Sequence, residues 1–195
     1  GRLEYWKKVS YLIYTYINNM PHSYHFGKPD AIEFITKNTT KDSKILDVGP
    51  GVGTYADLLN PLGYSMDCLE IYDGYVGAYN LKEKYKNVYV GNIVDFDVSK
   101  YDFVIIGDVL EHLTIEDSNI VLNKCKNVIV AVPYICPQSG VDFMYEDFHL
   151  INPYEKHLQS DLTPLIMLTR YPMLGLIWSN ELYGYYSNIQ WKGYY

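Results

Sequence analysis

Short apolar stretches alternate with amphipathic ones through the middle of the chain. Apolar-rich runs of the kind that form strands occur at 44–48, 66–71, 87–90, 101–107 and 127–132. Between them lie segments with helical spacing, which predict helices at 54–60, 73–85 and 119–125. Strands that alternate with helices indicate βαβ units and a parallel sheet covered on both faces.

The two ends of the chain have different patterns. Residues 3–18 carry Tyr, Ile and Leu at mixed helical spacing, and 30–37 follow a proline, so both predict helices. The runs 174–179 and 183–190 are rich in strand-forming residues, with Tyr183-Gly184 as the break, and predict a closing antiparallel hairpin. The expected fold class is therefore α/β, with a doubly wound, mostly parallel seven-stranded sheet and a C-terminal antiparallel hairpin.

Composition narrows the possible partners. The chain has 195 residues and a formal net charge of −7, which disfavours a nucleic-acid substrate because phosphate backbones need a positive surface. No apolar run approaches the ~20 residues that cross a bilayer. The three cysteines form no paired motif and predict buried free thiols in a reducing, cytoplasmic compartment. Most of the 22 tyrosines are expected to fill the core and strand faces, although some could stack on a flat ligand.

A glycine-rich turn follows the first predicted strand of the sheet. Residues 45–54 read I-L-D-V-G-P-G-V-G-T, so Asp47 at the strand end precedes Gly49, Gly51 and Gly53. Glycines at these points let the backbone turn with positive φ and let a ligand approach the main chain. The following helix start offers unpaired N–H groups that favour a negatively charged group.

The spacing of these glycines separates two classes of cofactor. A dinucleotide site needs G-x-G-x-x-G, and Thr54 breaks that pattern, which excludes a dinucleotide oxidoreductase. Asp47 would repel a pyrophosphate, but it suits a ligand that carries an ammonium group. The amino-acid end of a zwitterionic ligand fits both features, with its carboxylate at the helix start and its amine near Asp47.

The stretch resembles motif I of the class I S-adenosylmethionine-dependent methyltransferases, and the resemblance covers most of the chain. It implies a Rossmann-like domain that binds S-adenosyl-L-methionine, yields S-adenosyl-L-homocysteine, and uses the loop from Asp47 to Gly53, Pro50 included, as a cofactor site. No repeat, low-complexity tract or linker rich in Gly, Ser or Pro divides the chain, so a single domain over 1–195 is expected. Within it we expect an N-terminal helical cap (1–40), a cofactor-binding half (41–132), and an acceptor-side insertion with the closing hairpin (133–195).

Two later strand ends add to the expected cofactor site. Glu70 ends the second strand, where an acidic side chain can accept hydrogen bonds from both ribose hydroxyls; a solvated carboxylate is the alternative. The resemblance places Ile71 against the adenine. It also places Asn92 and Ile93 there, although the family often has Asp where Asn92 stands, and Asn can still accept a hydrogen bond through its carbonyl.

The fourth strand ends in D-V-L-E-H-L at 108–113, which resembles a signature of the small-molecule branch of the family. Asp108 is expected near the methionine end of the cofactor and the acceptor. Glu111 and His112 are expected to enter the next helix, either as a structural pair or, for His112, in direct chemistry. Asp108 and a later carboxylate could hold Mg²⁺, but no spacing requires this and no metal is predicted.

An alcohol acceptor needs a base, because a protonated hydroxyl is a poor nucleophile. Residues 146–158 are dense in His, Asp and Glu, and their N-P-Y-E-x-H stretch, followed by Thr163-Pro164, is similar to the segment that covers the active site in related methyltransferases. His157 is the first candidate for the base and His149 the second. An inert surface histidine is the alternative for each.

The acceptor is the least constrained part of the prediction. Loops rich in Tyr, His and carboxylates suit a polyhydroxylated molecule, so O-methylation of a sugar or glycan is expected, with no nucleic-acid or membrane partner. O- or N-methylation of another small metabolite stays open, as does a catalytically silent domain that binds the cofactor as a partner module. The chain begins with Gly, so both a tag remnant and a domain of a longer polypeptide fit.

Overall fold

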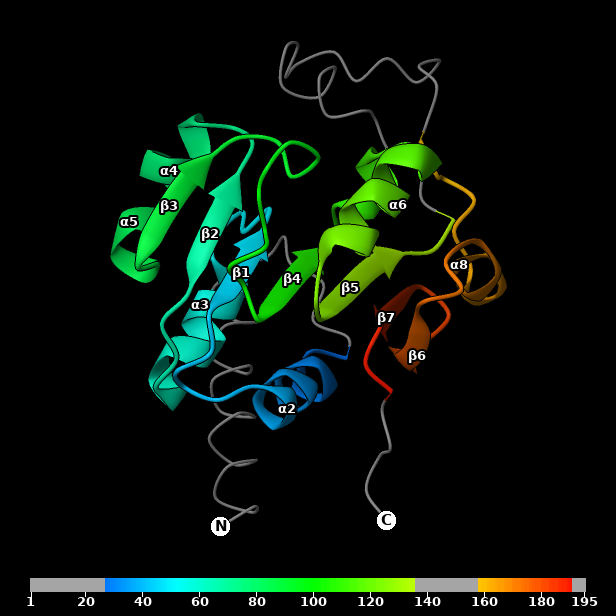
Figure 1. Cartoon of the computed structure of the whole chain (residues 1–195), viewed down its shortest axis with the longest axis horizontal. Helices are drawn as coiled ribbons and strands as arrows, with labels where there is room; N and C mark the ends of the chain where they lie inside the picture. Colours follow the sequence, from blue (N-terminus) through cyan, green and yellow to red (C-terminus); the bar gives the residue numbers. More distant parts are fainter. Residues whose placement is uncertain (1–26, 136–157, 191–195) are drawn as a thin grey trace.

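The computed structural model describes residues 27–135 and 158–190 (Figure 1). Its centre is a seven-stranded sheet in the order β3-β2-β1-β4-β5-β7-β6. The strands are β1 (Ile45–Val48), β2 (Asp67–Glu70), β3 (Asn87–Val90), β4 (Phe103–Gly107), β5 (Val128–Pro133), β6 (Gly175–Ser179) and β7 (Tyr183–Ser187). Strands β1 to β5 pair in parallel, whereas β7 pairs antiparallel with both β5 and β6. The predicted doubly wound sheet with a closing antiparallel hairpin is confirmed.

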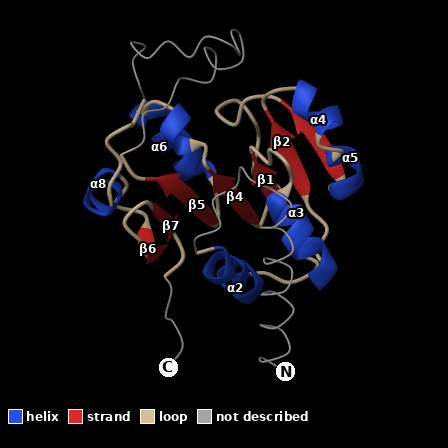
Figure 2. Cartoon of the chain, turned by 180° about the vertical axis from the view of Figure 1, so that it is seen from behind, coloured by secondary structure: helices blue, strands red, loops and turns tan. Residues whose placement is uncertain are grey.

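Helices cover both faces of this sheet (Figure 2). The helical segments are α2 (Lys28–Asn38), α3 (Thr54–Leu59), η1 (Asn60–Leu62), α4 (Gly74–Ala78), α5 (Leu81–Lys84), η2 (Leu110–His112), α6 (Ile115–Lys124) and α8 (Pro164–Arg170). Helices α2 and α3 pack on one face, and η2, α6 and α8 pack on the other. The helix predicted at 3–18 lies outside the described residues.

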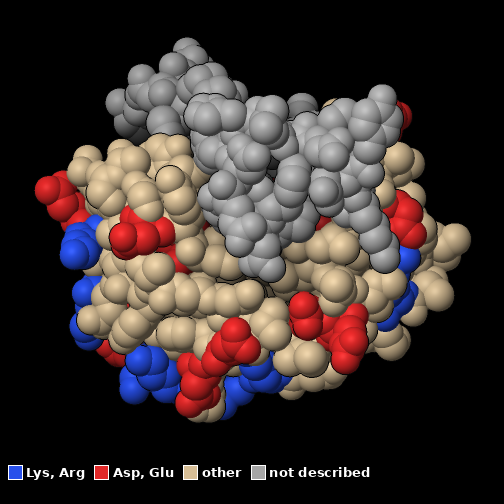
Figure 3. Space-filling view, turned by 90° about the horizontal axis from the view of Figure 1, so that it is seen from above, with Lys and Arg blue, Asp and Glu red and all other residues tan. Residues whose placement is uncertain are grey.

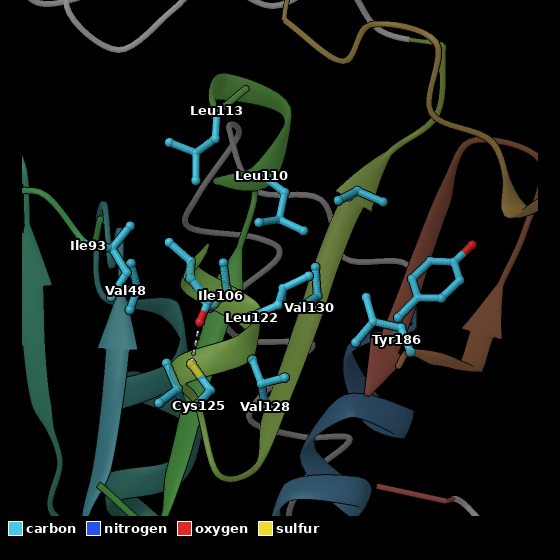
Figure 4. Packing of buried hydrophobic residues seen from close by; sticks show 14 of the residues in the cluster. Val48, Ile93, Ile106, Leu110, Leu113, Leu122, Cys125, Val128, Val130 and Tyr186 are labelled. Carbon is cyan, nitrogen blue, oxygen red and sulfur yellow. Dashed lines mark hydrogen bonds between the residues drawn. The ribbon is translucent and has the colours of Figure 1, made fainter. Parts of the chain in front are cut away.

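The two-residue period of the strands divides the core into two layers. In β1, Ile45 belongs to the layer under α2 and α3, whereas Leu46 and Val48 belong to the layer under α6. Figure 4 shows the second layer, where Val48 and Val130 of the strands pack with residues from η2 and α6. Because consecutive side chains of β1 point to opposite faces, the direction of every residue up to Val48 is fixed by its position along the strand.

The segment at 73–85 forms two short helices, so the prediction of one helix is wrong. Helix α4 ends at Ala78, and Asn80 has a left-handed backbone with φ 53° before α5 begins. Gly74 and Gly77 give α4 a low helix propensity, and asparagine tolerates the left-handed region better than most residues. The break brings Lys84, at the end of α5, back to the glycine loop, where its Nζ donates to the carbonyl of Val52 at 2.9 Å.

Helix α6 contains most of the segment 119–125 that is predicted to lie in a helix. It starts at Ile115, because the hydroxyl of Thr114 accepts the N–H of Asp117 at 3.0 Å and caps the first turn. Glu111 and His112 lie before this cap, in the 3₁₀ helix η2, which is the first helical segment after β4 and is separate from α6. Thr163 caps α8 in the same way and Pro164 opens it, as the Thr-Pro pair indicates.

The tyrosines and cysteines of the described ranges lie mostly inside. Tyr171, Tyr183 and Tyr185 are among the fully buried side chains, which confirms that many tyrosines serve as core residues. Cys68 and Cys125 are buried free thiols, as predicted. Across 27–135 and 158–190, no helix combines the length and hydrophobicity that a membrane span requires.

Candidate functional site

A cleft with about 610 Å³ of empty space opens where the parallel strands end. Its lining comes from the loops after β1, β2, β3 and β4, the edge at which doubly wound sheets bind their ligands. The predicted site residues that the structure brings together in this lining are Gly49, Gly51, Glu70, Ile71, Asn92, Ile93, Asp108 and His112. Tyr75 of α4 also lines the cleft, although nothing in the sequence distinguished it from the other tyrosines.

Loop 49–53 turns sharply between β1 and α3. The amide of Gly49 donates to the carbonyl of Leu69 at 2.9 Å, and the amide of Gly53 donates to the carbonyl of Pro50 at 2.9 Å. Pro50 and Gly53 are buried and lie outside the cleft lining, so they shape the turn and do not line the cleft. Gly51, between them, has φ 54° and faces the cleft.

The glycines of this loop differ in what a side chain would meet. A Cβ atom on Gly49 would lie 2.8 Å from Val109, and one on Gly53 would lie 2.8 Å from Lys84. Among the described residues, a Cβ atom on Gly51 would have no neighbour within 4 Å, so it would project into the space of the cleft. Because Gly51 has no side chain, the main chain of the loop at Gly49 and Gly51 is open to the cleft; we call this stretch the cradle. Such a cradle fits a ligand that contacts the backbone.

Asp47 lies beneath the cleft and not in its lining. By its position in β1 it shares the face of Ile45, and its carboxylate, 2% exposed, accepts the hydroxyl of Tyr85 at 2.5 Å. Burial raises the pKa of Asp47 to about 7, against the lowering effects of Tyr85 and the positive charge of Lys28. Asp47 is therefore not part of the cleft lining, and its direct contact with a ligand's amine stays a prediction.

The raised pKa of Asp47 predicts how stability depends on pH. Between about pH 4 and 7 the folded chain holds a proton on this carboxyl that the unfolded chain releases, so the free energy of unfolding falls as the pH rises. Asp47→Asn keeps an acceptor for Tyr85 and carries no charge. We expect it to flatten this fall, by on the order of 2–4 kcal/mol at pH 8. Urea titrations between pH 5 and 8 measure the difference, with the exposed Asp42→Asn as control; equal slopes in all three proteins would contradict it.

Glu70 places a buried carboxylate at the cleft wall. It is 2% exposed, and its Oε1 accepts the amide of Tyr72 at 3.0 Å. Burial raises the pKa of Glu70, and the amides of Tyr72, Gly51 and Ile71 act in the opposite direction by favouring the charged form. The carboxylate thus joins the end of β2 to the glycine loop, and it can accept hydrogen bonds from two neighbouring hydroxyls of a ligand.

A lysine organises the loop that follows β3. The Nζ of Lys124, in α6, donates to the carbonyls of Ile93, of Val94 at 3.0 Å and of Phe96 at 2.8 Å. The Oδ1 atom of Asn92 accepts a hydrogen bond from the amide of Val94 at 3.0 Å, so this oxygen already has a partner within its own loop. Burial lowers the pKa of Lys124. The shape of the cleft wall at 92–93 therefore depends on a residue from a helix far along the chain.

Asp108 forms part of the cleft floor just beyond β4. Its backbone is left-handed, with φ 57°, and its Oδ1 accepts the hydroxyl of Tyr183, from β7, at 2.7 Å. Asp108 is exposed at the cleft, and the protein atoms packed around its carboxyl group raise its pKa by desolvation. Lys28 and His112 lower the pKa of Asp108. The closing hairpin therefore holds a carboxylate in place at the floor.

Glu111 and His112 are neighbours with different surroundings. His112 lines the cleft, whereas Glu111 is 2% exposed and lies outside the lining. Its Oε1 is 3.9 Å from the Nε2 of His112, and its Oε2 has no hydrogen-bond partner within residues 27–135 and 158–190. Burial, together with the charge of Asp108, raises the pKa of Glu111 well above its usual value. Of this pair, only His112 is positioned to contact a ligand.

The candidate bases His149 and His157 lie outside the described residues. Gln159, at the start of the second described range, is anchored under η2. Its Nε2 donates to the carbonyls of Leu110 and Leu113, both at 2.8 Å, and to the hydroxyl of Ser118 at 2.9 Å. Gln159, which belongs to the predicted acceptor-side insertion, therefore fixes this part of the chain to the turn that carries His112.

The surface around the cleft mixes charges of both signs. Figure 3, which looks onto the edge where the parallel strands end, shows acidic and basic side chains dispersed over the described part of this face. Among residues 27–135 and 158–190, no three His, Cys, Asp or Glu side chains gather closely enough to hold a metal ion.

Comparisons with known proteins agree with this architecture. The methyltransferase domain family matches residues 16–159. The structure is similar to the PH0226 protein of Pyrococcus horikoshii OT3, with a TM-score of 0.58 and 13% identity over 85% of this chain and 91% of that one. It is similar to the bacterial CtHen1 methyltransferase domain, with a TM-score of 0.52 and 14% identity over 83% and 97% of the two chains. No curated protein sequence matches the chain.

A third similar structure, magnesium protoporphyrin IX methyltransferase from Synechocystis PCC 6803, was solved with bound S-adenosylhomocysteine. Its TM-score is 0.50, with 16% identity over 80% of this chain and 77% of that one. Identities this low establish a shared fold and leave the acceptor open. The family match covers most of the chain, and the open glycine cradle and the buried Glu70 lie where the fold places its ligand. The chain therefore belongs to the methyltransferase domain family and is a class I S-adenosylmethionine-dependent methyltransferase.

Proposed function

We propose that the protein transfers the methyl group of S-adenosylmethionine to a hydroxyl of a sugar or glycan. The observation that carries the proposal is the cleft itself. It joins an open main-chain cradle at Gly51, a buried carboxylate at Glu70 and a polar floor at Asp108 and His112. The cradle and Glu70 suit the cofactor, and the polar floor suits an acceptor that presents hydroxyl groups.

The residues that would hold the cofactor follow from the lining. The loop at Gly49 and Gly51 would lie against the carboxylate of its amino-acid end, close to the start of α3, and Glu70 would lie against its ribose hydroxyls. Ile71 and Ile93 offer apolar contacts to a flat ring, and Asn92 lies beside them. Asp47, ionised above pH 7 and separated from the cleft by the loop, contributes negative potential that favours an ammonium group above it.

The chemistry asks little covalent work of the protein. The bound cofactor supplies an electrophilic methyl group on a positively charged sulfur. The protein must align the acceptor oxygen with that methyl group and remove the hydroxyl proton, so that the oxygen–carbon bond forms as the carbon–sulfur bond breaks. We propose His157 as the base that takes the proton, with His149 as the second candidate and Asp108 and His112 orienting the acceptor.

A mass-shift screen tests the proposal. The protein is incubated with S-adenosylmethionine and a panel of reducing-end and nucleotide-activated sugars, with amines and thiols as further acceptors. A gain of one methylene mass on a sugar, lost in His157→Ala with S-adenosylhomocysteine affinity preserved, is the expected result. Methylation of amines alone would move the acceptor class to N-methylation. Cofactor binding without transfer to any acceptor would support a silent cofactor-binding domain.

The hydrogen bonds from Lys124 to the carbonyls of the 93–96 loop predict a second measurable effect. Lys124→Met leaves the carbonyls of the 93–96 loop without their shared donor, so we expect about tenfold weaker binding of S-adenosylhomocysteine and a loss of about 2 kcal/mol in unfolding free energy. Calorimetric titration and urea unfolding measure the two quantities. Lys126→Met, on an exposed lysine of the same region, should leave both within error. Unchanged affinity in Lys124→Met would mean that the loop keeps its shape without the hydrogen bonds from Lys124.

A further inference from the structure

A second cleft lies at the opposite edge of the sheet, where the parallel strands begin. It has about 880 Å³ of empty space and shares no lining residue with the cofactor cleft. The first residues of three strands belong to it: Ile45 of β1, Asp67 of β2 and Asn87 of β3. A four-residue strand spans ~13 Å, so a ligand at this edge would not overlap one at the other.

The charge of this second cleft differs from that of the protein. Four of the chain's 16 basic residues line it, together with two carboxylates, so its lining is net positive in a chain of net charge −7. The lining lysines are Lys41, Lys44, Lys86 and Lys100. We call this feature the lysine cleft. A positive concavity on an acidic protein attracts small anions, because field lines are focused between its walls.

Three of these lysines have no protein partner for their charge. Within the described residues, the Nζ atoms of Lys41, Lys44 and Lys86 make no ion pair and no hydrogen bond. Lys100 donates to the hydroxyl of Tyr89 at 3.3 Å, and its Nζ lies 5.2 Å from the ring centre of Tyr101. Ammonium groups that line one cleft and form no ion pairs repel one another, and an anion bound among them reduces that repulsion.

The carboxylate at the base of the lysine cleft is already engaged. Asp67 accepts the side-chain amide of Asn87 at 2.9 Å through Oδ1 and the hydroxyl of Tyr101 at 2.7 Å through Oδ2. It is therefore held by neutral donors and forms no ion pair with the lysines. Ser43 and Ser65 also line the cleft and add hydroxyl donors, so the lining offers both positive charge and hydrogen bonds to an oxyanion.

We infer that the lysine cleft binds a compact diphosphate-bearing anion. Several lysines and two hydroxyl donors around one concavity match the several oxygens of two linked phosphates better than a single carboxylate. An extended polyanion is disfavoured, because the acidic surface beyond the cleft would repel it. Free pyrophosphate and a nucleoside diphosphate present the same group, and titration with each distinguishes the source.

The experiment titrates the whole chain with pyrophosphate and, separately, with uridine diphosphate by calorimetry at low ionic strength. We expect saturable binding, at least tenfold weaker in the double variant Lys44→Ala/Lys86→Ala. The control Lys82→Ala/Lys126→Ala removes the same charge from exposed lysines outside the cleft and should change affinity less than threefold. Tighter binding of uridine diphosphate identifies a nucleotide as the source, and equal binding identifies the phosphates alone.

Two results would overturn the inference: no saturable binding of either anion to the native chain, or equal weakening in the cleft and control variants. A competition arm keeps this test apart from the methyl-transfer proposal. Saturating S-adenosylhomocysteine should leave the anion affinity unchanged, because the two clefts share no residue. Displacement of the anion by S-adenosylhomocysteine would place it in the cofactor cleft and so reject the lysine cleft as its site.

Discussion

Replacing Glu70 by Gln is expected to weaken S-adenosylhomocysteine binding by about 30- to 100-fold. A buried carboxylate at the cleft wall can accept two hydrogen bonds from vicinal hydroxyls, and charged acceptors form stronger bonds than neutral ones. The Gln amide keeps one acceptor and turns the other into a donor. A loss of about 2–3 kcal/mol in binding free energy corresponds to that range.

The fold should tolerate Glu70→Gln. The amide oxygen can still accept the Tyr72 amide, and the change removes a buried charge, so the free energy of unfolding should change by less than about 1 kcal/mol. Calorimetric titration at pH 8 measures the affinity, with Glu83→Gln as the matched control on an exposed residue of α5. A variant that binds as tightly as the native chain would show that Glu70 does not contact the ribose.

The same carboxylate predicts a pH dependence of binding. Because burial raises the pKa of Glu70, protonation removes the charged acceptor at a higher pH than for an exposed glutamate. The affinity of the native chain should therefore decline as the pH is lowered toward the acid range, and that of Glu70→Gln should decline less. This comparison attributes the titration to one residue, although Asp47 and Asp108 lie nearby.

The order of the elements could be predicted because hydrophobic period and glycine position are local properties of the sequence. The run 45–54 identifies a strand, a turn and a helix start without reference to the rest of the chain. The two-residue period of β1 also indicates that Asp47 lies on the same face of the strand as Ile45. The prediction that Asp47 contacts the amine of the ligand rests on its distance along the chain from the glycines, and it stays a prediction; the face of the strand adds that Asp47 lies outside the cleft lining.

The residues that hold the site residues in place could not be predicted, because these contacts join residues that are far apart in the sequence. Tyr183 meets Asp108 only because β7 inserts antiparallel beside β5, and Lys124 meets the 93–96 loop only because α6 packs against that edge. Nothing in the local sequence distinguishes either residue from its neighbours. The sequence did contain one missed signal, since Thr114 followed by Asp117 is a typical helix start and would have kept Glu111 out of α6.

Replacing Gly51 by Ala is expected to weaken S-adenosylhomocysteine binding by on the order of 100-fold while leaving the protein folded. At φ 54° an alanine costs about 1–2 kcal/mol of unfolding free energy. In the described part of the chain its methyl group would meet no atom within 4 Å, so no clash there adds to that cost. The same methyl group would occupy the cradle that the ligand needs, and overpacking at a close contact costs about 1–3 kcal/mol in addition to the lost main-chain hydrogen bonds.

Gly63→Ala separates backbone strain from loss of the cradle. Gly63 also has a positive φ, of 97°, and the described atoms nearest to its Cβ would belong to the flexible side chain of Lys41, at 3.1 Å or more. It lies after η1 and outside the cofactor cleft, so the control should lose similar stability and keep full affinity. If both variants lose affinity in proportion to their stability, backbone strain explains the effect. If only Gly51→Ala loses it, the ligand lies against the main chain at Gly51, because the two substitutions differ chiefly in the space that the new methyl group enters.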